Sequence, residues 1–250
     1  MLKIIRPIPT DQIRLLIFDL DGTLVDSRQD LANAVNAMLR NLGRPELPCD
    51  VIATYIGDGA PMLVRRALGD PNDEAYVRSA IEYFMLWYRE HKLDNTYVYS
   101  GIFDALRAIR ARRNGNVKMA VLSNKPVNPS RAIVEALGLG EFFFQTYGGN
   151  SFETKKPDPY GAFKLCEEAG VKPDQAVMIG DSQNDILTAK NAAMWSIGLT
   201  YGLAPQTLEI YPPDILIDKP EELATVFGAE SAAHVASSAE MPQGEGFTGD

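Results

Sequence analysis

The chain has 250 residues, of which 46% are hydrophobic and 23% charged, and its formal net charge is −9. This composition is typical of a globular protein with a large core, and its acidity argues against a nucleic-acid-binding surface, which needs many Lys and Arg side chains. The two cysteines have no CxxC spacing and the two histidines are far apart, so a zinc site of the usual Cys/His type is excluded.

Near-continuous apolar runs of strand length recur along the chain, beginning with RLLIFDL at residues 14–20. Such runs predict strands that are buried on both faces of a parallel sheet. Similar runs occupy residues 117–124, 142–149, 175–181, 194–200 and 213–218. Helical patterns separate them at residues 101–115, 128–140, 158–170 and 183–193. The alternation predicts an α/β fold with a doubly wound, mainly parallel, Rossmann-like sheet and three α/β/α layers.

Residues 26–99 interrupt this alternation with helical patterns only. Residues 27–43 carry one apolar stripe, and residues 73–93 form a longer amphipathic segment. We predict a core domain of residues 1–25 and 100–228 and an all-helical cap domain of residues 26–99. An aromatic cluster in the second segment is expected to pack between helices rather than bind a ligand. Its members are Phe84, Trp87 and Tyr88.

The sequence contains no recognisable targeting or membrane-spanning segment. Neither the first residues nor any later stretch forms a signal peptide or a long uncharged apolar span, which predicts a cytoplasmic protein with no membrane partner. Residues 229–250 are small, polar and glycine-rich without an apolar period, and this predicts a disordered tail. The sequence leaves open whether the protein is a monomer or a homodimer.

Polar residues follow four of the predicted strands. Ligands of open α/β sheets bind beyond the carboxyl ends of the strands, so these residues are expected to share one rim. They are Asp19, Asp21, Gly22 and Thr23 after the first strand, Ser123 and Asn124 after the second, Lys155 and Lys156 in a later loop, and Asp181 and Asp185 after the fourth. Carboxylates without soft ligands suit Mg²⁺, which favours phosphate-bearing substrates. A cation would also allow Asp19 and Asp21, which point to the same side of an extended chain, to lie together.

Each of these features also has an ordinary structural explanation. Asp21-Gly22 is a common turn, and Ser123-Asn124 is a common strand exit. Asp181-Ser182 is typical of a helix N-terminus, and Lys155-Lys156 could be a solvated pair. Only their expected convergence at one rim favours a functional site.

The same segments carry a family resemblance. DLDGT, LSN, KKPDP and GDSQND resemble, in order, the four motifs of the haloacid dehalogenase superfamily of phosphatases, over roughly residues 13–227. The helical insert resembles that superfamily's cap domain. IGDGAPMLVRRALGD and GGNSFETKKPDP are similar to the bacterial phosphoglycolate phosphatase subgroup.

The resemblance implies roles for the acidic residues. Asp19 would attack phosphorus and form an aspartyl-phosphate, and Asp21 would act as general acid and then general base. Mg²⁺ would be held by the Asp19 carboxylate, the Asp21 backbone carbonyl and Asp181. Asp185 would support these ligands rather than bind the metal directly.

It also implies a phosphate-binding set. Ser123 and the backbone near Gly22 would donate hydrogen bonds to the phosphoryl oxygens, and Lys156 would offset their charge. Thr23 and Asn124 are expected to join the substrate site.

The expected cap contributes a further candidate loop. Gly57, Asp58 and Gly59 form either a helix-entry turn or a flexible loop that covers the phosphate site and tests the leaving group. Arg65 and Arg66, shortly after it, could bind a substrate carboxylate or lie on a solvated helix face.

These expectations favour a Mg²⁺-dependent phosphomonoesterase acting on a small phosphate ester, with 2-phosphoglycolate as the leading substrate. A sugar-phosphate phosphatase or a phosphomutase of the same superfamily is the closest alternative. A receiver-type signalling domain also has strand-end aspartates, a lysine and Mg²⁺. Such a phosphoacceptor needs neither the general acid Asp21 nor a cap, so these two features argue against it.

Overall fold

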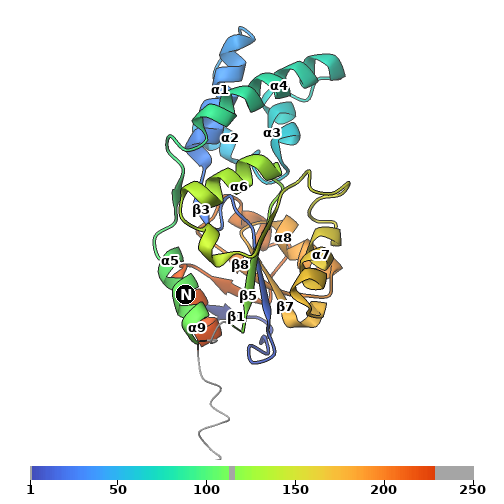
Figure 1. Cartoon of the computed structure of the whole chain (residues 1–250). Coiled ribbons are helices and arrows are strands. Elements are labelled where there is room, and N and C mark those ends of the chain that lie inside the picture. Colours follow the sequence, from blue (N-terminus) through green and yellow to red (C-terminus); the bar gives the residue numbers. More distant parts are fainter. Residues whose placement is uncertain (1, 113–115, 229–250) are drawn as a thin grey trace, which may run out of the picture.

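The computed structural model describes residues 2–112 and 116–228, and its centre is a seven-stranded sheet (Figure 1). The strand order is β1-β9-β8-β7-β2-β5-β6, and only the pairing of β1 with β9 is antiparallel. The strands are β1 (Lys3–Ile4), β2 (Leu15–Phe18), β5 (Lys118–Leu122), β6 (Gln145–Tyr147), β7 (Ala176–Gly180), β8 (Trp195–Leu199) and β9 (Ile215–Ile217). This arrangement confirms the predicted doubly wound, mainly parallel α/β fold.

Strand β2 is an interior strand of the sheet, between β5 and β7. All four of its side chains are fully buried, and they divide between two hydrophobic clusters on opposite faces. Leu16 and Phe18 belong to one cluster, and Leu15 and Ile17 belong to the other. Alternating side chains of a strand point to opposite faces, so an uninterrupted apolar run is what a strand covered on both sides requires.

Helices cover both faces of this sheet. Helices α5 (Ile102–Arg112), α6 (Val127–Ala136) and α9 (Glu221–Gly228) supply apolar side chains to the cluster that holds Phe18. Helices α7 (Tyr160–Ala169) and α8 (Gln183–Asn191) supply them to the cluster that holds Ile17. Figure 1 shows α5 and α9 together on one side of the sheet and α7 and α8 on the other. The three-layer arrangement is therefore present.

Four helices form an insert between two short strands. They are α1 (Arg28–Asn41), α2 (Cys49–Ala53), α3 (Ala60–Ala67) and α4 (Glu74–His91), and we call residues 28–91 the helical insert. They bury a hydrophobic cluster of their own, with Leu31, Val35, Leu63 and Phe84 among its members. The two chain passes that connect it pair as antiparallel strands β3 (Val25–Asp26) and β4 (Tyr97–Val98).

A buried carboxylate ties the start of the insert to its end. Asp30 on α1 accepts hydrogen bonds from the backbone N–H of Asn95 and Thr96 and from both of their side chains, at 2.7–3.0 Å. Because Asp30 is completely buried, these donors replace the water that its charge would otherwise require.

Each of the six predicted strands is present, with ends within a few residues of the predicted ones. Strand β1, helix α2 and the pair of β3 with β4 were not expected, because two to five residues are too few to show a period. Helix α9 was also not expected. Both cysteines are free thiols. No helix among the described residues has the length and apolarity needed to cross a bilayer. The predicted disordered tail, residues 229–250, lies outside the described residues.

Candidate active site

The polar residues predicted at the strand ends do meet at one rim of the sheet. In the parallel register, Phe18 of β2 lies opposite Val121 of β5 and Ile179 of β7. The residues that follow these positions are therefore neighbours, and the backbone N–H of Asp19 donates to the carbonyl of Ile179 at 2.9 Å. Strand order reverses at β2, so this rim is the switch point where open α/β sheets bind ligands.

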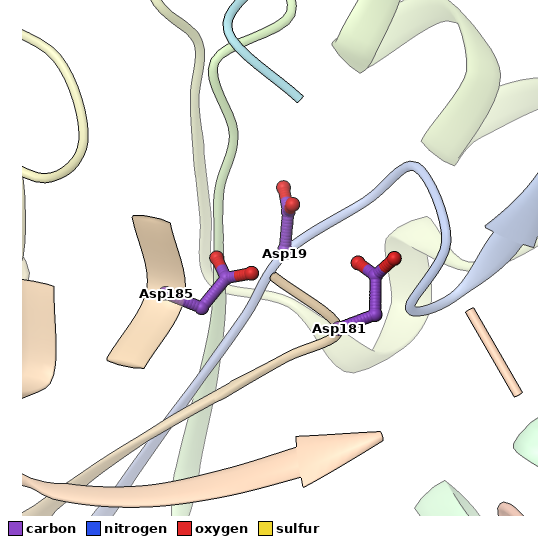
Figure 2. A group of neighbouring side chains, drawn as sticks. All are labelled: Asp19, Asp181 and Asp185. Carbon is purple, nitrogen blue, oxygen red and sulfur yellow. The ribbon is translucent and has the colours of Figure 1, made fainter. Parts of the chain in front are cut away.

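Three carboxylates form a compact group there. The Asp19, Asp181 and Asp185 side chains each place an oxygen within 4.8 Å of the others, and all three residues are buried. Asp19 follows β2, Asp181 follows β7, and Asp185 lies in the first turn of α8. Figure 2 shows the carboxyl group of Asp19 between those of Asp181 and Asp185. We call these three residues the carboxylate cluster.

Lys156 is the cation that lies within this cluster. Its Nζ is 2.6 Å from Asp185 Oδ1 and 2.9 Å from Asp19 Oδ1, and its side chain is 1% exposed. Although burial acts to lower it, the charges of Asp185 and then Asp19 hold the pKa of Lys156 above its usual value. Lys156 is therefore a buried charged group, and the solvated-pair interpretation is wrong for it. Its neighbour Lys155 is exposed and donates to the backbone carbonyl of Asp58.

Both carboxylate oxygens of Asp185 already have partners inside the protein. Oδ1 accepts from Lys156, while Oδ2 accepts from the N–H of Ser182 at 3.1 Å and from its hydroxyl at 2.8 Å. These contacts form a capping box at the start of α8. Asp185 is thus better placed to orient Lys156 than to bind an ion itself.

Asp181 is held by the chain that follows β8. Its Oδ2 accepts from the backbone N–H of Leu203 at 2.6 Å and of Ala204 at 3.1 Å. Gly22 approaches it so closely that a Cβ at position 22 would lie 2.3 Å from Asp181 Oδ2, and its φ of 83° also disfavours other residues. The glycine of the DLDGT segment is therefore required for the fit between the ends of β2 and β7.

The cluster carries more negative charge than its one lysine offsets. Burial raises the pKa of Asp19 to about 6, against the attraction of Lys156. Burial, and then the charges of Asp185 and Asp19, raise the pKa of Asp181 to about 8. A second positive charge would relieve this repulsion, and the oxygen ligands are those that a hard divalent cation such as Mg²⁺ prefers. Asp19 and Asp181 therefore fit the metal-binding roles implied by the family resemblance.

Asp21 lies outside the carboxylate cluster. Its carboxylate accepts from Ser27 Oγ at 2.5 Å and from Lys125 Nζ at 3.0 and 2.9 Å. The side chain of Asp21 is thus paired with a second buried lysine, and the cation that would bind Asp19 and Asp181 is not needed to balance it. As a metal ligand, Asp21 would act through its backbone carbonyl, as the resemblance implies.

The remaining residues predicted to bind phosphate or substrate in the core are also buried. Ser123 directly follows β5, and its Oγ accepts from the N–H of Lys125 at 3.3 Å. Thr23 is directed at Asp181, with Oγ1 3.4 Å from its Oδ1. Asn124 donates from Nδ2 to the carbonyls of Lys156 and Gly57, each at 3.0 Å, and so connects the core to the insert.

The loop of residues 57–59 reaches the rim, as one of its two interpretations requires. Asn184 on α8 donates to Asp58 Oδ1 at 2.8 Å and to the carbonyl of Gly57 at 3.3 Å. Although burial acts to raise it, the donors Asn184 and Arg66 hold the pKa of Asp58 below its usual value. Gly59 has φ 84°, and a Cβ there would lie 2.8 Å from the carbonyl oxygen of Asn124. Close backbone contact with the core therefore requires glycine at position 59.

A small pocket lies between the core and the insert, and we call it the junction pocket. Its polar wall comes from the core: Asp19, Asp21, Ser123, Asn124 and Lys125. Its apolar wall comes largely from the insert: Leu31, Ile56, Leu63, Phe84, Met85 and Tyr88.

Arg65 and Arg66 bind acidic residues of the insert. Arg65 donates to both Glu74 oxygens at 2.7 Å, and Arg66 donates to Asp58 Oδ2 at 2.5 Å. Neither lines the junction pocket. The structure therefore does not support the idea that they bind a substrate carboxylate.

Sequence reasoning missed three residues of the site: Lys125, Asn184 and Tyr88. Lys125 directly follows Ser123-Asn124 at a strand end, and Asn184 lies between Asp181 and Asp185, so their positions could have indicated them. Tyr88 was expected only to pack between helices. It does stack on Phe84, with ring centroids 5.7 Å apart, but it also lines the junction pocket.

Comparisons with known proteins agree with this geometry. The sequence pattern of the haloacid dehalogenase-like hydrolases matches residues 16–199. Phosphoglycolate phosphatase of Pseudomonas putida is 40% identical over 212 residues, which are 82% of this chain and 76% of that protein. Its counterpart in Photobacterium profundum is 36% identical over 221 residues, which are 86% of this chain and 95% of that protein.

Solved structures show the same relationship. A predicted phosphoglycolate phosphatase from Haemophilus somnus superposes with a TM-score of 0.80 at 32% identity, over 86% of this chain and 98% of that one. CbbY from Rhodobacter sphaeroides, solved in complex with phosphate, superposes with a TM-score of 0.66 at 25% identity, over 84% of this chain and 96% of that one.

The chain therefore belongs to the haloacid dehalogenase-like hydrolases, and it is an enzyme of that class. Within the family, it is similar to bacterial proteins named phosphoglycolate phosphatase.

The adjacent lysines offer a matched test of the buried charge. Without metal, Lys156→Met should lower the free energy of unfolding by roughly 3–5 kcal/mol, because it leaves two buried carboxylates without their cation. Lys155→Met, at an exposed position, should lower it by less than about 1 kcal/mol. Urea unfolding at pH 7 in EDTA measures both, and equal losses would show that Lys156 is not a buried counter-charge.

The raised carboxyl pKa values predict how pH and Mg²⁺ act on stability. A carboxyl whose pKa is higher in the folded than in the unfolded state binds extra protons when folded, and it loses that stabilisation as pH rises through the folded value. The metal-free protein should therefore lose stability between about pH 4 and pH 8, through Asp19 and Asp181. Mg²⁺ binds the deprotonated carboxylates, so it should raise Tm more at pH 8 than at pH 5.

Asp181→Asn is the control for this pH effect. It removes the carboxyl with the larger shift, so the Mg²⁺-induced rise in Tm should become small at both pH values. A rise in this variant equal to that of the unaltered protein would place the ion elsewhere.

Proposed function

We propose that the protein is a Mg²⁺-dependent phosphomonoesterase that acts through an aspartyl-phosphate, with 2-phosphoglycolate as its substrate. The observation that carries this proposal is the position of Asp19. It lies at the switch point of the sheet, in the carboxylate cluster, and also lines the junction pocket. A nucleophile at the boundary between a charged cluster and a pocket that opens toward the insert is what covalent phosphoryl transfer requires.

Asp19 would attack phosphorus and form the covalent intermediate. Lys156 Nζ and the backbone N–H of Leu20, at 2.9 and 2.7 Å, both contact its Oδ1 and so orient the carboxylate. Lys156 would also offset the charge of the phosphoryl group, and the Ser123 hydroxyl would donate to one of its oxygens. Asp185 would hold Lys156 in place for these roles.

Asp21 would transfer protons in both half-reactions. It would protonate the leaving alkoxide as the P–O bond breaks, and it would then take a proton from the water that hydrolyses the aspartyl-phosphate. Its position on the pocket wall two residues after Asp19 is compatible with a group that faces the leaving-group side.

The metal ion would be held by Asp19, Asp181 and the backbone carbonyl of Asp21. When bound, Mg²⁺ would supply positive charge to the phosphoryl oxygens and to the carboxylate that attacks phosphorus. Because Gly22 and the backbone N–H groups of Leu203 and Ala204 fix the Asp181 side chain, this ligand is in place before an ion binds.

The helical insert would act as a cap, a second domain that selects the leaving group. Its loop of residues 57–59 contacts Asn124 and Asn184 of the core, so it is seated over the rim. Its apolar wall would exclude bulk water during the first half-reaction. The substrate assignment to 2-phosphoglycolate is supported by relatives that carry that name at 36–41% identity.

A screen of phosphate monoesters tests the proposal. With Mg²⁺, the protein should release phosphate repeatedly from 2-phosphoglycolate, faster than from sugar phosphates, and EDTA should abolish the release. Asp19→Asn, which is nearly isosteric, should lower the rate by about a thousandfold or more, because the nucleophile is lost. A single stoichiometric labelling without turnover would indicate a phosphoacceptor, and an isomerised phosphate ester would indicate a phosphomutase.

Leaving-group dependence tests Asp21. Asp21→Asn should slow the phosphorylation of Asp19 by an alkyl phosphate about 10²–10⁴-fold, because the alkoxide then leaves without a proton. The loss should be clearly smaller with p-nitrophenyl phosphate, whose leaving group is a much weaker base. Rapid-quench measurement of the first turnover gives both rates, and an equal loss with the two substrates would exclude Asp21 as the acid.

A further inference from the structure

The junction pocket contains a cation that the proposed mechanism does not use. Lys125 is the only Lys or Arg among the described residues that line this pocket, and its side chain is 4% exposed. It forms an ion pair with Asp21, with its Nζ 3.0 and 2.9 Å from the two carboxylate oxygens. An ammonium has three N–H donors, and besides the two Asp21 oxygens Lys125 also interacts with the Tyr88 hydroxyl. Lys125 thus already binds one carboxylate at the wall of the pocket.

Tyr88, from helix α4 of the insert, lies against this lysine. The ammonium is 4.8 Å from the centroid of the Tyr88 ring. The Tyr88 hydroxyl is buried and makes no hydrogen bond of standard geometry with the described residues. Burial raises the pKa of Tyr88 to about 12, so its hydroxyl keeps its proton at neutral pH and can donate. The Tyr88 hydroxyl oxygen interacts with the Lys125 ammonium, so its proton is still available to a ligand oxygen.

The rest of the insert's wall cannot bind a charge. Leu31, Ile56, Leu63, Phe84 and Met85 are apolar, and Arg65 and Arg66 are paired with acidic residues outside the pocket. Among the described residues that line the pocket, Lys125 is therefore the one positive charge that can meet an anionic group projecting from the phosphate site toward the insert.

We propose that Lys125 Nζ and Tyr88 Oη bind a carboxylate on the leaving group, and that this pair makes small phosphorylated carboxylic acids the preferred substrates. The inference rests on the proposed function and deepens it. The core supplies the charge, and the insert supplies the neutral donor, so both parts of the protein must meet for the carboxylate to be recognised. Lys125 and Tyr88 are binding residues in this assignment and take no part in proton transfer.

The test compares two esters that differ in the carboxylate. 2-Phosphoglycolate and ethyl phosphate share the phosphate and the first methylene, and only the former is a carboxylic acid. In the unaltered protein, kcat/KM should favour 2-phosphoglycolate by about a hundredfold or more. Lys125→Met should reduce this preference about 10- to 100-fold, and Tyr88→Phe about 3- to 10-fold. Any disturbance of Asp21 by Lys125→Met affects both esters, so it cancels in the ratio.

Two controls make the result specific. Lys92→Met removes an equal charge one turn beyond Tyr88, outside the pocket lining, and should leave the preference unchanged. Phosphoethanolamine, which carries an ammonium in place of the carboxylate, should be a poorer substrate than ethyl phosphate, and Lys125→Met should reduce that difference.

The outcomes separate this inference from the proposed function. The carboxylate assignment is overturned if the preference for 2-phosphoglycolate is undiminished in Lys125→Met, or if it is near one in the unaltered protein. In either case, release of phosphate from the esters would still support the phosphatase function. No release from any ester by the unaltered protein overturns the function and the inference together. If Lys125→Met does not fold, Tyr88→Phe decides the matter, since it removes a single hydroxyl and keeps the ring. An unchanged preference there overturns the shared site.

Discussion

The buried negative charge at the end of strand β2 determines which donors and cations must surround it. Three carboxylates whose oxygens lie within 4.8 Å of one another are buried with one lysine between two of them. Such a group is stable only if each remaining oxygen has a donor or a cation. Asp185 has its donors in the capping box at Ser182, and Asp181 has them in the backbone N–H groups of residues 203 and 204. The absence of a side chain at Gly22 leaves room for Asp181.

The two buried lysines divide the site into two ends. Lys156 lies in the carboxylate cluster, where a phosphoryl group would be transferred, and Lys125 lies on the pocket wall beside Asp21. Their separation allows one positive charge to act on the phosphate and the other on the remainder of the substrate. In a protein with a net charge of −9, such local cations are needed to attract a substrate that is itself an anion.

The helical insert supplies the apolar wall of the junction pocket, opposite the polar wall from the core. Contacts from Asn124, Asn184 and Lys155 reach the loop of residues 57–59, so core and insert share one hydrogen-bond network around the pocket. The insert has its own hydrophobic cluster and is tied to its exit strand through Asp30. The insert therefore holds Tyr88 and the apolar wall together on its side of the junction pocket.

The sequence by itself determined the class of fold, the strands and the acidic rim. Apolar runs such as residues 14–20 report burial on both faces directly, and parallel strands bring the residues that follow them to one edge whatever the details of packing. The roles of Asp19, Lys156 and Asp181 came from the motif resemblance and remain predictions. Only the tertiary structure decided which charges are partners. It paired Asp21 with Lys125, and it directed Arg65 and Arg66 to the acidic residues Glu74 and Asp58. It also placed Tyr88 at the pocket as well as in the helical core. Asp21 and Lys125 are 104 residues apart and meet only because β2 and β5 are neighbours in the sheet. The arginine pairs depend on how α3 packs within the insert, and the position of Tyr88 depends on how the insert lies against the sheet. A local sequence pattern encodes none of these contacts.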